Sequence, residues 1–428
     1  MMWIKKIILP LLLVIVLSTI VIISFGENQE ENLRISQIHQ TPFVGPTVYD
    51  IPFESYEAFD ETLVEEKSFI HKINVISVGD IMAHTIQLEA AKTENGYDFY
   101  PQLEEIKDKI SSKDFAIGNL ETVMAGEDRR YSGKNMIFNT PDNLAVSLKK
   151  AGFDILTTAN NHALDRGFYG VKRTQEVLEK EGLLYTGTYT SDERDILTFS
   201  KDGFSFALLS YSFSTNGWPM PEENPHTLNM MEREIIYKDI ERAKEMAVDF
   251  IIVANHWGLE YHLDENHHQR DLTHDLFYAG ADIILGTHPH VLQPFDHIKM
   301  KDSSGMYKDK FVIYSQGNFL SGQRTYPRAI GMYINFEFER NGSQKYVSEV
   351  SVMPTYVESG YKNGKRFMRV LDVYQSRLDY DAGQLDMSSS LYQNLQVYER
   401  DFIEHLSSKV QMTPYLNENN EYVIYEVN

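Results

Sequence analysis

Between residues 73 and 314, short apolar runs alternate with longer segments whose apolar residues recur at helical spacing. The short runs are rich in β-branched and aromatic residues, which favour strands. Seven of them have the composition of buried strands: Ile73–Val78, Phe115–Ile117, Phe153–Thr158, Phe204–Ser210, Phe250–Val253, Ile283–Leu285 and Phe311–Tyr314. Helices are predicted at four places between them: Asn143–Ala151, Tyr169–Glu181, Glu232–Ala247 and Gln269–Ala279. This alternation is typical of α/β architecture.

The pattern changes after Gly331, where strands follow one another with few crossovers. Three are predicted: Met332–Phe338, Tyr346–Val352 and Arg366–Leu371. An amphipathic helix is predicted near the end of the chain, at Ser388–Ser407. We therefore expect one α/β domain over residues 71–360, followed by an extension over residues 361–428 to which the pattern assigns no role.

The first 26 residues predict a membrane anchor. Lys5 and Lys6 precede an apolar run, Ile7–Phe25, which approaches the roughly 20 residues that a helix needs to cross a bilayer. Positive charge precedes this run and acidic residues follow it. We therefore expect a single span in the cell membrane, with a cytoplasmic N-terminus and an extracellular main domain. A cleaved signal peptide is the alternative, with Ser24-Phe25-Gly26 as a weak match to a cleavage site.

Residues 27–70 have neither a strand pattern nor a helix pattern. They are polar and acidic, with Pro42, Pro46 and Pro52 among scattered aromatic residues. This composition predicts an extracellular tether that is extended or draped over the main domain.

Composition narrows the classes of function. The chain of 428 residues has a formal net charge of −22, which offers no basic field to nucleic acid or to anionic lipid head groups. We therefore expect no nucleic-acid partner. Cysteine is absent from the sequence, and this excludes thiolate zinc sites, iron–sulfur clusters and disulfide scaffolds.

Candidate chemistry gathers where the apolar runs end. Six runs end with a short group of small and polar, ligand-type residues: Gly79-Asp80, Gly118-Asn119-Leu120-Glu121, Ala159-Asn160-Asn161-His162, Asn255-His256, Gly286-Thr287-His288-Pro289-His290 and Gly317-Asn318. In open α/β sheets, ligands bind beyond the carboxyl ends of the strands, where loops converge. Six such groups in one chain predict one shared site.

Each member of these groups also has an ordinary structural interpretation. Asp80 could cap a helix, and Asn161 could hold a turn. His162 could be a core histidine, and Glu121 could be a surface carboxylate. Their recurrence at strand ends favours the shared site over four separate explanations.

The pair His288 and His290 indicates metal binding. In extended chain, residues i and i+2 project to the same side, so both rings can face one point. Imidazole, carboxylate and amide ligands without thiolate suit a hard-to-borderline divalent ion. We expect Mn, Fe, Zn or Mg, as one ion or two, and such an ion lowers the pKa of a bound water to supply a nucleophile.

His162 is the candidate catalytic residue for acid–base chemistry. It could protonate a leaving group, with Asp165 three residues later as the carboxylate that orients its ring. The alternative for Asp165 is a helix N-cap, because a helical pattern follows Gly167.

As a set, the motifs resemble those of the CapA/PgsA-type capsule synthesis proteins. The shared motifs are GDIM (Gly79–Met82), GNLE (Gly118–Glu121), ANNHALDRG (Ala159–Gly167), NHWGLEY (Asn255–Tyr261), GTHPHVLQP (Gly286–Pro294) and YSQGNF (Tyr314–Phe319). The resemblance spans residues 73–338 and implies a part in making and exporting poly-γ-glutamate. It also implies a fold similar to calcineurin-like metallophosphoesterases, a sandwich of two mixed sheets flanked by helices around a dinuclear metal centre.

Carried over residue by residue, the phosphoesterase pattern implies five metal ligands: Asp80, Asn161, His256, His288 and His290. Two departures are visible. Met82 stands where the first motif has histidine, and Asn119 replaces the acid of the second motif. Glu121, two positions later, is then the candidate for the bridging ligand. These departures favour reduced or altered metal chemistry.

Further residues in the motifs are candidates for contact with the metal ligands or the substrate: Asn119, Arg166, Trp257, Glu260 and Asn318. Arg166 suits an anionic substrate, although a surface role fits as well. Trp257 and Tyr261 could line the pocket or simply pack in the core. Four more histidines follow the fourth motif, and we expect them to be solvated: His262, His267, His268 and His274.

Two functions fit these motifs. The first is a membrane-anchored component of poly-γ-glutamate synthesis or export, which binds the anionic polymer and other membrane subunits. The second is a metal-dependent hydrolase that acts on phosphoesters, or on γ-glutamyl or cell-wall polymers, outside capsule synthesis. The first does not require catalysis, whereas the second does.

Overall fold

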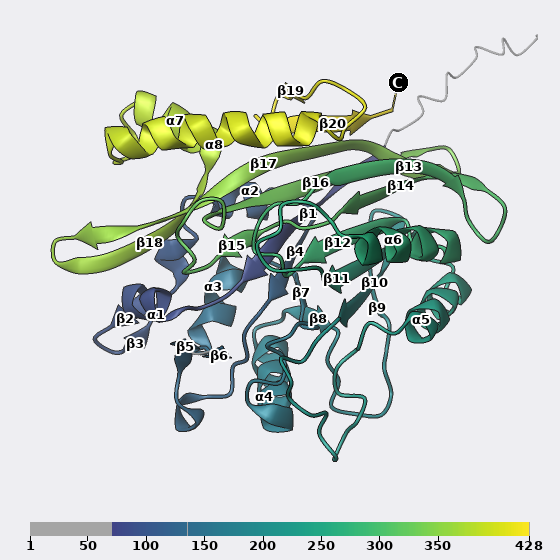
Figure 1. Ribbon diagram of the computed structural model, residues 1–428, viewed down its shortest axis with the longest axis horizontal. Helices are drawn as coiled ribbons and strands as arrows, with labels where there is room; N and C mark the ends of the chain where they lie inside the picture. Colours follow the sequence, from purple (N-terminus) through teal and green to yellow (C-terminus); the bar gives the residue numbers. More distant parts are fainter. Residues whose placement is uncertain (1–70, 135, 428) are drawn as a thin grey trace, which may run out of the picture. The chain divides into compact units, whose positions relative to one another are not determined.

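The computed structural model describes residues 71–134 and 136–427 (Figure 1). They form two mixed β-sheets with flanking helices. The predicted anchor and tether, residues 1–26 and 27–70, lie outside the described residues. Within the two described ranges, no helix has the length and apolar character needed to cross a bilayer.

The larger sheet has ten strands and is built around β1. Its main path runs β19-β20-β17-β16-β1-β4-β7-β8, while β15 pairs with β1 and β18 pairs with β17. The strands are β1 (His71–Ile81), β4 (Phe115–Leu120), β7 (Ile155–Thr157), β8 (Leu184–Thr186), β15 (Asn318–Leu320), β16 (Ile330–Asn341), β17 (Gln344–Lys362), β18 (Lys365–Asp372), β19 (Tyr415–Leu416) and β20 (Tyr422–Glu426). β1, β4, β7 and β8 run parallel, so their carboxyl ends lie at the same end of the sheet.

The smaller sheet has six strands in the order β13-β14-β12-β11-β10-β9. The strands are β9 (Leu197–Lys201), β10 (Phe204–Ser212), β11 (Phe250–His256), β12 (Ile283–Thr287), β13 (Phe295–Lys301) and β14 (Tyr307–Ile313). The central strands β10, β11, β12 and β14 are parallel. Their carboxyl ends therefore also lie together, as the predicted site requires.

Helices flank the two large sheets (Figure 1). Two short hairpins form separate two-stranded sheets. The α-helices are α1 (Thr85–Ala91), α2 (Lys107–Ser111), α3 (Asn143–Lys150), α4 (Gly167–Lys180), α5 (Arg233–Glu245), α6 (His267–Ala279), α7 (Val373–Asp381) and α8 (Ser389–Ser407). The small elements are hairpins β2 (Lys92–Thr93) with β3 (Gly96–Tyr97) and β5 (Ser132–Lys134) with β6 (Ile137–Asn139), and 3₁₀ turns Tyr100–Gln102 and Glu127–Arg129.

Strand β11 shows how the core is organised. Its residues are buried on both faces, which is typical of a parallel sheet covered on each side. Ile252 belongs to the large cluster that joins the two sheets, together with residues of β1 and β4. The next residue, Val253, belongs to the cluster beneath α5 and α6. Successive side chains thus point to opposite faces, and the smaller sheet lies between the larger sheet and two helices.

The α/β architecture with two mixed sheets is confirmed. The predicted strands and helices all occur, most with ends displaced by a few residues, although β17 continues to Lys362, well beyond the predicted end at Val352. One detail was wrong: Gly317-Asn318 does not end a strand. Strand β14 stops at Ile313, and Asn318 begins the short β15 because the chain crosses there to pair with Asp80 of β1.

Residues beyond 360 continue the larger sheet. β18 pairs with β17 along its whole length, and β20 pairs with an earlier stretch of the same edge of β17, opposite β16. Glu421, fully buried beside β20, accepts a hydrogen bond from Lys113 (2.9 Å) and one from Ser351 (2.8 Å). The segment after residue 360 is thereby hydrogen-bonded to the larger sheet, which also contains the strands that carry part of the predicted site.

Candidate metal centre

The predicted ligand-type residues meet where parallel strands of both sheets end. The larger sheet supplies four from the ends of β1, β4 and β7, and the smaller sheet supplies three from β11 and β12: Asp80, Glu121, Asn161, His162, His256, His288 and His290. All seven are buried. A cluster of carboxylates and imidazoles is therefore enclosed in the interior of the protein, with further buried polar residues such as Asn119 and Asn318 around it.

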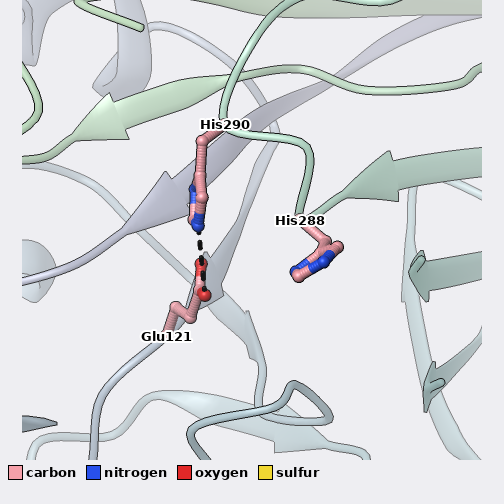
Figure 2. A group of neighbouring side chains, drawn as sticks. All are labelled: Glu121, His288 and His290. Atoms are coloured by element: carbon pink, nitrogen blue, oxygen red, sulfur yellow. Dashed lines mark ion pairs between the residues drawn. The ribbon is translucent and has the colours of Figure 1, made fainter. Parts of the chain in front are cut away.

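Glu121 is the centre of this cluster. Its Oε1 lies 3.6 Å from Nε2 of His256, 3.7 Å from Nε2 of His290 and 4.0 Å from Nε2 of His162. Figure 2 shows Glu121 and His290 pointing toward one another, with His288 beside them. Among the described residues, neither carboxylate oxygen of Glu121 has a hydrogen-bond partner. A buried carboxylate in this state is costly unless a cation compensates it.

Asp80 lies beside Glu121 and fixes the ring of His290. Its Oδ1 accepts a hydrogen bond from Nδ2 of Asn119 (2.8 Å), and its Oδ2 lies 3.0 Å from Nδ1 of His290. The same Nδ1 lies 3.1 Å from Oδ1 of Asn318. Because both neighbours are acceptors, the neutral ring carries its proton on Nδ1 and presents the lone pair of Nε2 to Glu121.

His256 makes the link between the sheets. Its Nε2 lies 3.1 Å from Oδ1 of Asn161, and its Nδ1 lies 3.0 Å from Oγ1 of Thr287. Nε2 of His256 therefore faces two oxygen acceptors, from Glu121 and Asn161. The neutral ring therefore carries its proton on Nε2 and accepts from Thr287 at Nδ1, and a cation bound by Glu121, Asn161 and His256 would take the place of that proton.

The loop after β12 holds its two histidines in an uncommon backbone conformation. His288 has φ of 98° and His290 has φ of 56°, in the left-handed region that residues with side chains seldom adopt. The backbone oxygen of Pro289 accepts a hydrogen bond of 2.8 Å from the backbone N–H of Tyr261. Such local strain persists where the surroundings fix it, and it occurs often at functional sites.

Burial and charge shift the pKa values of the cluster. Burial, followed by the charge of Asp80, raises the pKa of Glu121 well above its ordinary value. Burial lowers the pKa of His288 to about 3 and that of His256 well below its usual range, and neighbouring imidazoles act in the same direction. Burial is also the largest effect on His290 and opposes its protonation, but the hydrogen bond and charge of Asp80, with smaller contributions from Glu260 and Asn318, together raise its pKa. His256 and His288 are thus neutral at pH 7, the form that binds metals.

His162 and Asp165 form a hydrogen-bonded pair at the edge of the cluster. Nδ1 of His162 lies 2.8 Å from Oδ2 of Asp165, which also accepts a hydrogen bond from the backbone N–H of Phe138 (2.6 Å). The N-cap position of α4 is Arg166, so Asp165 does not cap that helix. Its carboxylate instead fixes the tautomer of His162, with the proton on Nδ1 and Nε2 directed toward Glu121.

The donor set fits a divalent metal ion. Two overlapping groups have ligand atoms within 4.8 Å of one another, namely Glu121, His288 and His290, and Asp80, Glu121 and His256. Glu121 belongs to both, which is the position that a bridging carboxylate takes. The orphaned oxygens of Glu121 and the absence of thiolate are compatible with Mn, Fe, Zn or Mg. The chemistry of the donors does not distinguish among these ions.

The remaining predicted residues lie in different surroundings. Asn119 and Asn318 contact the cluster directly, through Asp80 and His290. Trp257 packs in the apolar cluster beneath α5 and α6, where its Nε1 donates to the backbone oxygen of Tyr314 (2.9 Å). Trp257 therefore packs in the core, which is the second of the two interpretations given above.

Arg166 and Glu260 lie outside the cluster. The Arg166 guanidinium donates to the backbone oxygens of Arg129 (3.1 Å) and Arg130 (3.2 Å), which ties that loop to the start of α4. Glu260 is half-buried, and its charge contributes to the raised pKa of Glu121. The four histidines expected to be solvated are exposed: His262, His267, His268 and His274.

Two residues near the cluster carry no prediction from the motifs. Oδ1 of Asn216 accepts a hydrogen bond from Nδ2 of Asn161 (3.2 Å), and its Nδ2 lies 3.5 Å from Nε2 of His162. His84 follows β1, two residues after Met82, which stands where the phosphoesterase motif has histidine. A histidine so close to that motif could have indicated from the sequence that His84 lies near the cluster, although its spacing from Asp80 does not match the motif.

Comparison with known sequences gives a family match. The model for the family described as "Bacterial capsule synthesis protein PGA_cap" matches residues 74–323. The "PGA biosynthesis protein CapA" of Bacillus subtilis (strain 168) is 30% identical over 274 residues, which are 63% of this chain and 68% of that protein. The "Capsule biosynthesis protein CapA" of Bacillus anthracis is 28% identical over 298 residues, 68% of each chain.

Comparison with solved structures gives more distant similarity. The 5′-nucleotidase precursor from Thermus thermophilus has a TM-score of 0.42 and 12% identity, over 79% of this chain and 60% of that one. The calcineurin-like phosphoesterase YfkN from Bacillus subtilis has a TM-score of 0.40 and 12% identity, over 78% of this chain and 99% of that one.

Proposed function

This chain belongs to the PGA_cap family of bacterial capsule synthesis proteins, and we propose that it serves the synthesis or export of an anionic capsule polymer such as poly-γ-glutamate. The resemblance drawn from its motifs is confirmed by the family match over residues 74–323. Two relatives carry capsule or PGA biosynthesis in their names, and this chain covers 68% of each. The family match over residues 74–323 includes the strand ends that build the cluster.

The proposed location is the outer surface of the cell membrane. Residues 1–26 then act as a single-pass anchor with a cytoplasmic N-terminus, which the order of charges around Ile7–Phe25 supports. Anchored in this way, the main domain would meet the polymer as it leaves the membrane. Other membrane subunits of a synthesis complex are the expected partners.

The cluster around Glu121 is proposed to be a metal centre, and one observation carries this proposal. The buried Glu121 carboxylate faces three imidazole nitrogens and has no hydrogen-bond partner among the described residues. The residues that would hold the ion are Asp80, Glu121, Asn161, His256, His288 and His290. A bound divalent ion would polarise an anionic group and lower the pKa of a coordinated water.

The residues around the ion position have separate roles in this proposal. Asp165 keeps the proton of His162 on Nδ1, so Nε2 can exchange a proton with a group bound beside Glu121. Asn119 and Asn318 orient Asp80 and His290, and orienting partners of this kind tune metal ligands. Burial of the cluster excludes bulk water and strengthens each of these interactions.

The His162–Asp165 pair also favours a second candidate function. An imidazole held by a carboxylate in one tautomer is the arrangement of a general acid or base. Such a pair beside a metal centre suits a hydrolase acting on phosphoesters, or on γ-glutamyl or cell-wall polymers, outside capsule synthesis. A protein that only binds polymer has no need for this pair.

The test combines genetics with elemental analysis. The chromosomal gene is replaced by wild type, Glu121→Gln or His268→Gln, and surface polymer and bound metal in the purified full chain are measured. We expect Glu121→Gln to lose metal and polymer, while the exposed control His268→Gln retains both. Retained metal in Glu121→Gln would refute the metal centre. Normal polymer after deletion of the gene would refute the capsule role and leave the hydrolase.

A further inference from the structure

His84 is a partly buried histidine that none of the motifs includes. It precedes α1 and follows β1, the strand that carries Asp80. Its Nδ1 lies 3.0 Å from the backbone N–H of Gly322. A backbone N–H can only donate, so Nδ1 of His84 must be the acceptor and unprotonated. The neutral ring therefore carries its proton on Nε2.

The ring of His84 is held rigidly. A Cβ at position 322 would lie 2.5 Å from Cβ of His84, so only glycine allows this approach. On its other side the ring packs edge-to-face against Phe138, with centroids 5.0 Å apart. The backbone N–H of His84 donates to Oε1 of Gln87 (2.7 Å), which fixes the residue's own backbone.

This ring lies next to the metal centre. Phe138 also packs edge-to-face against His162, with centroids 4.6 Å apart, so one phenyl ring separates the two imidazoles. Burial lowers the pKa of His84 to about 4, and the charges of His290 and His162 act in the same direction. Both effects keep the imidazole of His84 neutral, and the second shows that it lies close enough to His290 and His162 to respond to their charges.

Nε2 of His84 has no protein acceptor among the hydrogen bonds of the described residues. It is not one of the buried unpartnered atoms, so it reaches solvent and is accessible to a ligand. The cluster itself consists mainly of acceptors: carboxylates, the oxygen of Asn161 and unprotonated imidazole nitrogens. Acceptors hold a cation, but the anionic group bound to that cation needs hydrogen-bond donors.

We propose that His84 is a substrate-binding residue that donates its Nε2 proton to an anionic oxygen of the bound substrate, a carboxylate or a phosphoryl group. The inference rests on the proposed function in one respect, namely that the substrate is anionic. It adds a specific donor, fixed by Gly322 and Phe138, to a site otherwise built of acceptors. A donor here selects for an anion over a neutral group.

The test uses two amide side chains, each of which reproduces the hydrogen bonding of one of the two ring nitrogens of His84. His84→Asn keeps an acceptor near Nδ1 for Gly322 but loses the donor at Nε2, whereas His84→Gln places an amide donor near Nε2. Full-length protein with bound Mn²⁺ is titrated calorimetrically with inorganic phosphate and, separately, with a γ-linked glutamate oligomer. Metal content and thermal midpoint are recorded for each variant.

We expect His84→Asn to weaken binding about tenfold, the loss of one hydrogen bond to a charged group, and His84→Gln to stay within about threefold of wild type. The probe whose binding is weakened in His84→Asn identifies the substrate oxygen as phosphoryl or carboxylate. Unchanged affinity in His84→Asn, the reverse order of the two variants, or loss of metal in both would overturn the role of His84. If wild type binds neither probe, the anionic substrate of the proposed function fails, and this inference fails with it.

Discussion

The two ends of β12 carry buried ionisable groups in opposite states. Asp282 precedes the strand, and its two oxygens accept hydrogen bonds from Lys310 (2.8 Å) and from the backbone N–H of Ile251 (2.9 Å). Lys310 is fully buried and also donates to the backbone oxygen of Ala281 (2.7 Å). His288 follows the strand and adjoins Glu121, whose carboxylate oxygens have no such partners among the described residues.

The difference separates a structural ion pair, Asp282 with Lys310, from a candidate ligand residue, Glu121. A buried charge with complete partners is tolerated within the fold, because its desolvation is offset by short-range bonds. A buried carboxylate without partners destabilises the fold until a ligand completes it. Asp282 precedes a strand of the smaller sheet and Glu121 follows a strand of the larger one, and both are buried, so the contrast reflects their partners and not the depth of burial. Four experiments test it, and they are ordered by the size of the expected effect.

The largest effect is expected from Lys310→Met. Removing the ammonium leaves buried Asp282 without its close counter-charge, and breaking a buried pair in this way costs about 3–5 kcal/mol of unfolding free energy. The matched control is Lys308→Met, since Nζ of Lys308 lies 3.9 Å from Asp282 and is more exposed. The control should cost less than about 1 kcal/mol. Urea unfolding in chelator measures both, and equal losses would mean that the Asp282 pair is not a structural one.

The second effect is stabilisation by metal. A ligand that binds only the folded state adds about 2.7 kcal/mol at a concentration 100 times its dissociation constant. Mn²⁺ should therefore raise the unfolding free energy of wild type and of Lys310→Met by the same increment. Glu121→Ala should show no increment. An increment in Glu121→Ala equal to that of wild type would place the metal elsewhere.

The ends of β12 also show how far the sequence predicts the molecule. Strand Ile283–Leu285 and the histidines after it were predictable, because apolar periodicity and ligand spacing are local signals. The pairing of Asp282 with Lys310 was not, since 28 residues separate them and no local pattern marks either one.

His84 shows the same limit at the metal centre. Its position depends on Gly322, 238 residues away, and on Phe138, which lies in a short hairpin. The helix it precedes, α1, has only seven residues and so gives no helical periodicity to detect. The candidate ligand set followed from strand ends, whereas the surrounding donors depend on contacts between distant segments.

The third effect has the opposite sign to the first. In chelator, Glu121→Gln should stabilise the protein by about 1–2 kcal/mol, because the amide removes a buried negative charge beside Asp80. The pKa of Glu121 is raised in the folded state, so the folded protein holds this proton more tightly than the unfolded chain. Wild-type stability therefore falls as pH rises above about 4.5, and Glu121→Gln should lack this component. Thermal midpoints from pH 5 to pH 8 measure it, and identical profiles would show that Glu121 is not a destabilising carboxylate.

The smallest effect concerns His288, whose pKa burial lowers to about 3 in the folded state. The unfolded chain, with an ordinary pKa near 6.5, then binds this proton more readily than the folded protein does. The stability due to neutral His288 is fully present above pH 6.5 and is lost progressively as pH falls from there toward the folded pKa of about 3. Between pH 7 and pH 6 the loss is about 0.7 kcal/mol, a quantity insensitive to the folded pKa when that pKa is far lower. In chelator, His288→Gln should show a shallower decline than wild type over this interval, while the exposed control His268→Gln should follow wild type. A decline in His288→Gln as steep as in wild type would mean that His288 gains a proton partner in the folded state, and the contrast with the satisfied end of β12 would then rest on Glu121 alone.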